Sequence, residues 1–143
     1  GVVYEYENGI RAHLHCRQMP HCYNDNNDFV VGSTGTCVVN AWNGAPTFTG
    51  SSSYQYEGDN PNMYQVEHNE MHEAIRGDRP TINNGDFMAQ STMMAILGRE
   101  AAYTGGRVSF EDALNSTLRL GPTKYKFGEL AMPPIPNPGT TRV

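Results

Sequence analysis

Alternation of hydrophobic and polar positions runs through the first 60 residues and predicts β-strands there. The clearest example is a pair of alternating runs, Val2 to Tyr6 and Ile10 to Arg17, on either side of Asn8-Gly9. Asn-Gly is the strongest two-residue hairpin signal, because both central positions of a type I′ turn require positive φ. The sequence therefore predicts a hairpin in which Tyr4 lies opposite His13.

This register divides the hairpin into two faces, because side chains alternate across a strand. One predicted face is mainly apolar and carries Val3, Glu5, Ile10, Ala12, Leu14 and Cys16. The other is mixed and carries Val2, Tyr4, Tyr6, Arg11, His13, His15 and Arg17. Tyr, His and Arg together are typical of a surface that meets another protein. We expect an oligomer interface at Tyr4, Tyr6, Arg11, His13 and His15; the alternatives are a wall of a ligand site or a solvated face.

Three more strands are predicted at Asp28 to Gly32, Thr36 to Ala41 and Thr47 to Glu57. Turn-forming segments rich in Asn, Gly, Asp and Pro separate them. With the hairpin, these strands predict an antiparallel meander over the first part of the chain.

The period then changes to that of helices. Apolar residues recur at helical spacing from Met63 to Arg76, and again from about Asp86 to Tyr103. Ser109-Phe-Glu-Asp112 opens a short third helix in the manner of a capping box. Five prolines after Leu120 interrupt regular structure, so residues 121–143 are expected to form an extended tail.

Strands followed by helices, without βαβ alternation, predict an α+β fold. We expect a mainly antiparallel sheet with helices packed on one face and an open face available for oligomerisation. The length, 143 residues, suits a single domain over residues 1–143.

Composition excludes several classes of protein. Hydrophobic residues make up 38% and charged residues 17%, which is typical of a folded domain. The net charge is −5 and the ten Lys and Arg residues are scattered, so nucleic acid is not an expected partner. No apolar stretch approaches the roughly 20 residues of a membrane span. Cys16, Cys22 and Cys37 are an odd number at irregular spacing, which predicts neither a disulfide framework nor a zinc site.

The chain opens directly on a predicted strand, which indicates a fragment of a longer protein. A cytoplasmic and an exported bacterial protein both remain open, because an export signal would lie upstream of Gly1.

Several segments, in the same order along nearly the whole chain, resemble the C-terminal domain of Gfo/Idh/MocA oxidoreductases, in particular the sugar and inositol dehydrogenase-like branch. They are Tyr6-Glu-Asn-Gly-Ile-Arg11 with His15-Cys-Arg-Gln18, Val31-Gly-Ser-Thr-Gly35, Asn62-Met-Tyr-Gln-Val-Glu-His68, Ala74-Ile-Arg-Gly77, Ser91-Thr-Met-Met-Ala-Ile-Leu-Gly-Arg99, Ala102-Tyr-Thr-Gly105 and Val108-Ser-Phe-Glu-Asp-Ala-Leu114.

The resemblance implies the second domain of a two-domain enzyme that acts on a sugar, cyclitol or related polyol. The missing N-terminal Rossmann domain would bind NAD(P) and carry a lysine in an E-K-P motif. Neither that motif nor a G-x-G-x-x-G loop occurs in this sequence, so no cofactor-binding residue is assigned here. The family's D-x-x-x-H motif is also absent, so no catalytic histidine is assigned. Dimers or tetramers through open sheet faces are implied as well.

Polar residues beside the predicted elements are candidates for the substrate side. Arg17 and Gln18 could donate hydrogen bonds to hydroxyls, and His68 could face an interdomain cleft. His68 and His72 lie four residues apart, but His68-Asn-Glu-Met-His72 is not an H-E-x-x-H motif and has no evident third ligand, so no metal site is expected. Two other functions stay open: a noncatalytic self-association or binding module, and an NAD-dependent glycosidase relative on the same scaffold.

Overall fold

A computed structural model describes residues 1–40 and 44–141 of the chain. The described residues form two compact units. Unit 1 joins Gly1–Gln18 to the chain from Asn83 onward, and unit 2 comprises Met19–Ile82. Residue 41, the last of one predicted strand, and residue 43, in a predicted turn, lie outside the described residues.

Unit 1 begins with an antiparallel hairpin of β1 (Val2–Glu5) and β2 (Arg11–Leu14). The Tyr6 amide donates to the Ile10 carbonyl at 3.0 Å and the Gly9 amide donates to the Tyr6 carbonyl at 2.9 Å. Only Gly9 has positive φ in this loop, at 81°. The connection is therefore a three-residue loop with a glycine bulge, and not the predicted type I′ turn.

The longer loop shifts the register by one residue, so the predicted pairing is wrong. Tyr4 pairs with Ala12 and Val3 pairs with His13, with Glu5 opposite Arg11. A one-residue shift moves every side chain of one strand to the other face. The two faces are therefore Val2 and Tyr4 with Ala12 and Leu14, and Val3 and Glu5 with Arg11 and His13.

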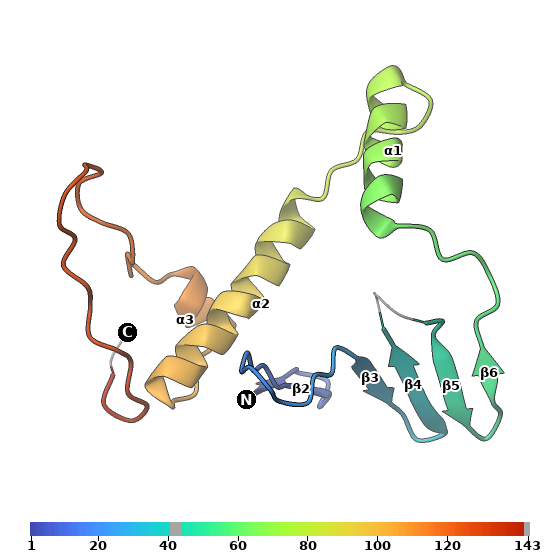
Figure 1. Ribbon diagram of the computed structural model, residues 1–143, viewed down its shortest axis with the longest axis horizontal. Coiled ribbons are helices and arrows are strands. Elements are labelled where there is room, and N and C mark those ends of the chain that lie inside the picture. Colours follow the sequence, from blue (N-terminus) through green and yellow to red (C-terminus); the bar gives the residue numbers. More distant parts are fainter. Residues whose placement is uncertain (41–43, 142–143) are drawn as a thin grey trace. The chain divides into compact units, whose positions relative to one another are not determined.

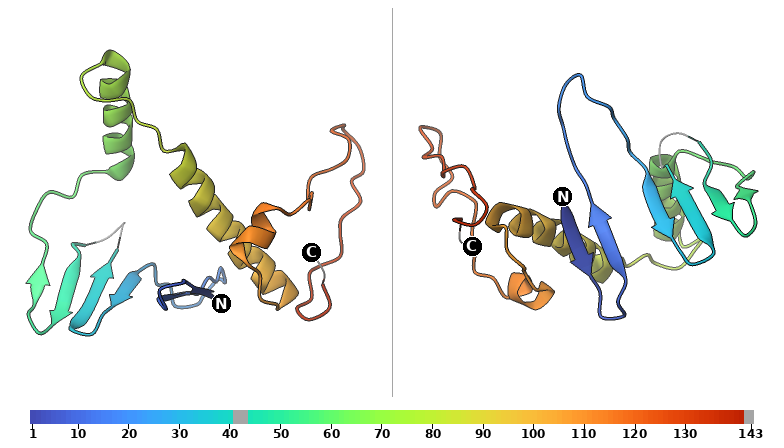
Figure 2. Two further views of the ribbon diagram at one scale, coloured as in Figure 1. Left: turned by 180° about the vertical axis from the view of Figure 1, so that it is seen from behind. Right: turned by 90° about the horizontal axis from the view of Figure 1, so that it is seen from below.

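Helix α2 (Gly85–Thr104) packs against the Tyr4 face of the hairpin. The Tyr4 hydroxyl donates to the Met94 carbonyl at 3.0 Å, and the side chains of Val2 and Tyr4 lie over Gly98. Gly98 is buried, as is Leu97, which is only 8% exposed. The core of unit 1 lies at this contact, which Figures 1 and 2 show with the blue hairpin beside the yellow helix.

Helix α3 (Phe110–Leu114) packs on α2. The Ser109 hydroxyl caps it by accepting from the Asp112 amide at 3.0 Å, as the sequence predicts. Beyond α3 the described chain has no helix or strand, and residues 137–141 return to the end of α2, where the Gly139 amide donates to the Thr104 carbonyl at 2.7 Å. The orange-to-red segment in Figure 2 follows this path.

Unit 2 contains a four-stranded antiparallel meander (Figure 1). Its strands are β3 (Asp28–Val31), β4 (Gly35–Val39), β5 (Thr47–Gly50) and β6 (Tyr54–Gln55). The single strand predicted from residue 47 to 57 is wrong, since a bend at residues 51–53 divides it in two. The Ser51 amide donates to the Thr34 carbonyl at 2.9 Å, which ties that bend to the neighbouring hairpin loop.

Helix α1 (Met63–Arg76) has the predicted bounds and two well-formed ends. The Asn62 side chain accepts from the amides of Tyr64 and Gln65, and Gly77 ends the helix in the left-handed region at φ 85°. The helix packs on none of the described strands of unit 2.

The α+β fold with antiparallel sheets is confirmed. Two details differ from the expectation. The described strands form two sheets and not one. The hairpin of unit 1 is covered by α2, whereas the four-stranded sheet of unit 2 is not covered by α1. In the described part of the chain, no helix combines the length and hydropathy needed to cross a bilayer.

Candidate functional site

Unit 1 contains a groove of about 630 Å³ along the edge of β1 that β2 leaves free. Its walls come from residues 2–7, from one face of α2 and from residues 106–110. The α2 wall consists of Met94, Leu97, Gly98 and Ala101. Val108 and Phe110 add further apolar surface, so this part of the lining is mainly hydrophobic.

The near wall of this groove is a strand edge. Tyr6 bonds to Ile10 across the hairpin, and alternate residues of an antiparallel strand point their amides and carbonyls toward the partner. The same groups of Val3 and Glu5 therefore point away from β2, into the groove. An unpaired edge of this kind is a template for an added strand.

Charged side chains border the groove on the face away from α2. The Glu5 carboxylate is 3.1 Å from the Arg11 guanidinium and 3.2 Å from that of Arg107. Arg107 is 89% exposed, so its pair with Glu5 is a surface ion pair worth at most about 1 kcal/mol. Glu7 also lines the groove and forms no ion pair among the described residues.

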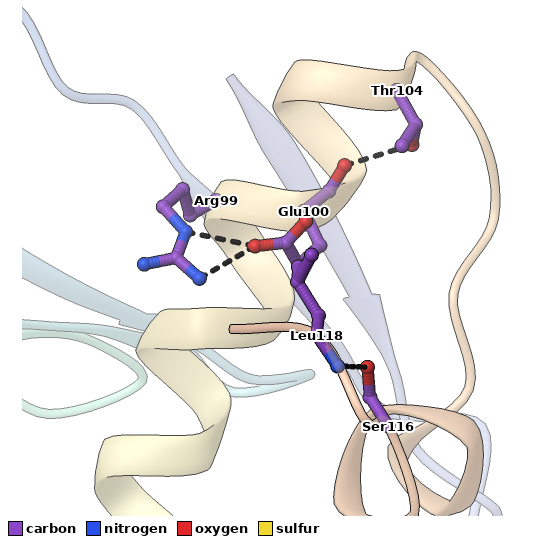
Figure 3. Close-up of polar contacts among 5 residues, drawn as sticks. All are labelled: Arg99, Glu100, Thr104, Ser116 and Leu118. Atoms are coloured by element: carbon purple, nitrogen blue, oxygen red, sulfur yellow. Dashed lines mark hydrogen bonds and ion pairs between the residues drawn. The ribbon is translucent and has the colours of Figure 1, made fainter. Parts of the chain in front are cut away.

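A second cavity of about 450 Å³ lies on another face of α2, beside Met93 and Ile96. The Glu100 carboxylate is buried there, with 8% of its side chain exposed. It accepts from Nε of Arg99 at 2.9 Å, which supplies the countercharge that a buried carboxylate needs. Figure 3 shows this pair, with Leu118 reaching toward Glu100 from the segment after α3.

The predicted substrate-side residues line neither cavity. Arg17 and Gln18 are exposed after β2 in unit 1, whereas His68 is exposed on α1 in unit 2. Nδ1 of His68 is 2.7 Å from the Tyr64 carbonyl one turn earlier, a contact within the helix. Their role toward a substrate stays a prediction.

The predicted interface residues are divided by the register. Arg11 and His13 lie on the open face with Val3 and Glu5, whereas Tyr4 faces α2 and is half-buried. Tyr6 follows β1 and lines the groove at 44% exposed. His15 follows β2 and lies next to Gly1. The interpretation of these residues as one continuous face is therefore wrong, because it rests on the wrong register.

Groups of three or more His, Cys, Asp or Glu side chains placed to hold a metal ion are not found in residues 1–40 and 44–141. The three cysteines are free thiols.

No protein-family model matches this chain, and no match is found among curated proteins or solved structures. The resemblance to the oxidoreductase domain therefore rests on the quoted segments alone.

Three features of the groove are absent from the predicted site: Gly98, Arg107 and the free edge of β1. Gly98 carries a signal in the sequence, since a glycine within a long helix often marks a close approach of another element. Arg107 and Glu5 are about one hundred residues apart, and local patterning does not relate such positions.

Proposed function

We propose that this chain is the substrate-side and assembly domain of a two-domain NAD(P)-dependent oxidoreductase that acts on a sugar, cyclitol or related polyol. The enzyme class, cofactor and substrate class come from the resemblance of the quoted segments. The observation that carries the assembly role is the open hairpin face, where Val3, Arg11 and His13 have no covering element in unit 1.

That face combines features of an interface. Val3 lies opposite His13 and is 53% exposed, and the Arg11 side chain is 65% exposed. Arginine and exposed aliphatic side chains together favour protein contacts over plain solvation. In this proposal the interface candidates on the hairpin are Val3, Arg11 and His13, and Tyr4 is left out because its hydroxyl bonds to α2.

NAD(P) does not fit the residues of this chain. Pyrophosphate binding needs a glycine-rich turn that leads from a strand into a helix. The described helices follow Asn62, Asn84 and Ser109, and no G-x-G-x-x-G run precedes them. In the proposal the cofactor belongs to the other domain, so no chemical step is assigned to this one.

Sedimentation velocity of the 143-residue chain tests the assembly role. We expect a dimer or tetramer at micromolar concentration, weakened by His13→Glu, which adds a second carboxylate to the face that carries Glu5. His72→Glu, the same change on exposed α1, is the matched control and should leave the association unchanged. A strictly monomeric wild-type chain would contradict the assembly role.

Titration calorimetry with NAD⁺ and NADH tests the proposal that the cofactor binds to the other domain and not to this one. We expect no binding heat, and tight binding to this chain would overturn the proposal. The coding sequence upstream of Gly1 is the third test, because it should encode a strand–G-x-G-x-x-G–helix unit followed by an E-K-P motif.

A noncatalytic self-association or binding module is the second candidate. The uncovered apolar positions of unit 2 favour it, since Phe29, Val30 and Val31 on edge strand β3 are 58%, 64% and 76% exposed. An upstream sequence without a nucleotide-binding unit would favour the noncatalytic module over the oxidoreductase domain.

A further inference from the structure

The segment between α3 and the C-terminal turn carries the most exposed large apolar side chains of the described chain. We define the arm as residues 121–136. Its exposed side chains are Tyr125 (89%), Phe127 (107%), Leu130 (62%), Met132 (80%) and Ile135 (91%). No hydrogen bond joins the arm to any other described residue. A run of large apolar side chains at this exposure is typical of a segment that binds another surface.

The arm has the pattern of a strand over Lys124-Tyr-Lys-Phe127. Aromatic and basic residues alternate, so an extended backbone places Tyr125 and Phe127 on one side and the two lysines on the other. Neither lysine forms an ion pair among the described residues.

The groove beside β1 has the complementary pattern. Leu97 and Phe110 give it an apolar surface, and Glu7 gives it a carboxylate that forms no ion pair among the described residues. The Glu5 carboxylate is already paired with Arg11 and Arg107. The groove is also bordered by the unpaired amides and carbonyls of the β1 edge. A strand added there would place its aromatic side chains on the apolar surface and a lysine beside Glu7.

We propose that residues 124–127 of one copy of this chain add to β1 of a second copy as the third strand of its hairpin sheet. By two-fold symmetry the second copy returns the same contact, so the arms are exchanged. Backbone hydrogen bonds to the edge supply affinity, and the alternate side chains set the register.

The occupant is assigned to the arm of a second copy, and an arm folded into the groove of its own chain is the alternative that crosslinking distinguishes. Leu118 and Leu120 line the cavity on the Met93 side of α2, whereas the groove lies on the Met94 side. The other end is held by the bond from Gly139 to Thr104.

The size of the contact suits a dimer. Buried Phe and Tyr side chains cover roughly 150–250 Å² each, so one arm buries roughly 300–500 Å². Each copy contributes one arm and one groove of similar area, so each partner buries roughly 600–1,000 Å². A standard interface needs about 800 Å² from each partner.

This inference rests on the self-association in the proposed function, but it uses a different surface from the open hairpin face. If His13→Glu weakens the oligomer while arm variants do not, the proposed function stands and the arm exchange is wrong.

Sedimentation velocity with arm variants is the first measurement. Phe127→Ser should raise the dimer dissociation constant at least about tenfold, equal to about 1.4 kcal/mol. Met132→Ser, in the same arm and similarly exposed, is the matched control and should change it less than about twofold. Glu7→Lys on the groove side should weaken the dimer, and Lys126→Glu in the same chain should restore part of the loss. Equal effects of Phe127→Ser and Met132→Ser would overturn the register.

Photo-crosslinking is the second measurement, and its readout does not depend on a variant that could also impair folding. A benzophenone side chain replaces Phe127 in unlabelled protein, which is mixed with ¹⁵N-labelled wild-type chain. We expect crosslinked peptides that join the unlabelled arm to labelled residues 2–7 or 106–110. Crosslinks confined to a single copy would show an arm folded onto its own chain, and crosslinks to other segments would show a different partner surface. Either result overturns the proposal.

Discussion

Substitution of Gly98 by alanine tests the contact on which unit 1 is built. Gly98 lies in the middle of α2 beneath the Tyr4 ring, and a Cβ at this position would overlap the Tyr4 hydroxyl. That hydroxyl is held in place, because it donates to the Met94 carbonyl at 3.0 Å. The added methyl group therefore requires the ring to move off the helix.

Two opposing effects set the sign of the change. Alanine in place of glycine within a helix stabilises it by about 1 kcal/mol. Loss of the hydrogen bond to Met94 costs about 0.5–1.5 kcal/mol. Overpacking of the hairpin against α2 costs about 1–3 kcal/mol more. The destabilising effects are larger, and we expect Gly98→Ala to lower the free energy of unfolding by about 0.5–3.5 kcal/mol.

The Tyr4→Phe background isolates the cause. Without the hydroxyl, the nearest ring atom is Cζ at 3.3 Å from the Cβ position, a distance that a small shift relieves. In this background Gly98→Ala should be neutral or stabilising by up to about 1 kcal/mol. The coupling energy between positions 4 and 98 should then be about 0.5–4.5 kcal/mol, the difference between the effects of Gly98→Ala in the two backgrounds.

Urea denaturation followed by circular dichroism at 222 nm measures these changes. Gly85→Ala at the start of the same helix is the control, since only the Asn83 side chain lies near its Cβ position, at 3.4 Å. It should not destabilise. If Gly98→Ala raises stability equally in wild type and in Tyr4→Phe, the tyrosine does not pack on α2 and the hairpin–helix contact is wrong.

Two further predictions concern the ends of α1. Asn62→Ala removes the side chain that accepts from two amides of the first turn and should reduce helix stability by about 0.5–2 kcal/mol, measured as faster amide exchange over residues 63–76. Asn62→Asp should retain the protection. Gly77→Ala should cost about 1 kcal/mol in unfolding experiments, because alanine is strained at φ 85°; an unchanged midpoint would show that the helix does not end in this conformation.

The helices were predictable because their signals are local. The predicted Met63 to Arg76 helix matches α1, and the longer predicted helix differs from α2 by one residue at each end. The serine cap of α3 is also present, and each of these features depends on residues within a few positions of one another. The number of strands after residue 47 was not predicted, because three successive serines give a weak turn signal within an alternating run.

The hairpin register was predictable in principle, but from the pattern of both strands and not from the turn dipeptide. Asn-Gly fits a type I′ turn and equally precedes a glycine bulge, so it leaves two registers open. The pairing of Tyr4 with Ala12 unites apolar residues on one face and places Glu5 opposite Arg11. The alternative pairing mixes apolar and charged residues on both faces. Burial of one face by α2 favours the first arrangement, and that choice decides which residues are available to a partner.

The candidate site is harder to predict, because it is made by positions distant in sequence. The groove exists only once Gly98 lets Tyr4 approach α2 and residues 106–110 return beside β1. Its two patterns are nevertheless visible separately in the sequence: acidic residues alternate with tyrosines in Tyr4-Glu-Tyr-Glu7, and lysines alternate with aromatics in Lys124-Tyr-Lys-Phe127. Complementary alternation favours strand pairing only where an edge is free and one side is apolar. The fold supplies both conditions at β1, and this is why the arm exchange follows from the structure and the sequence together.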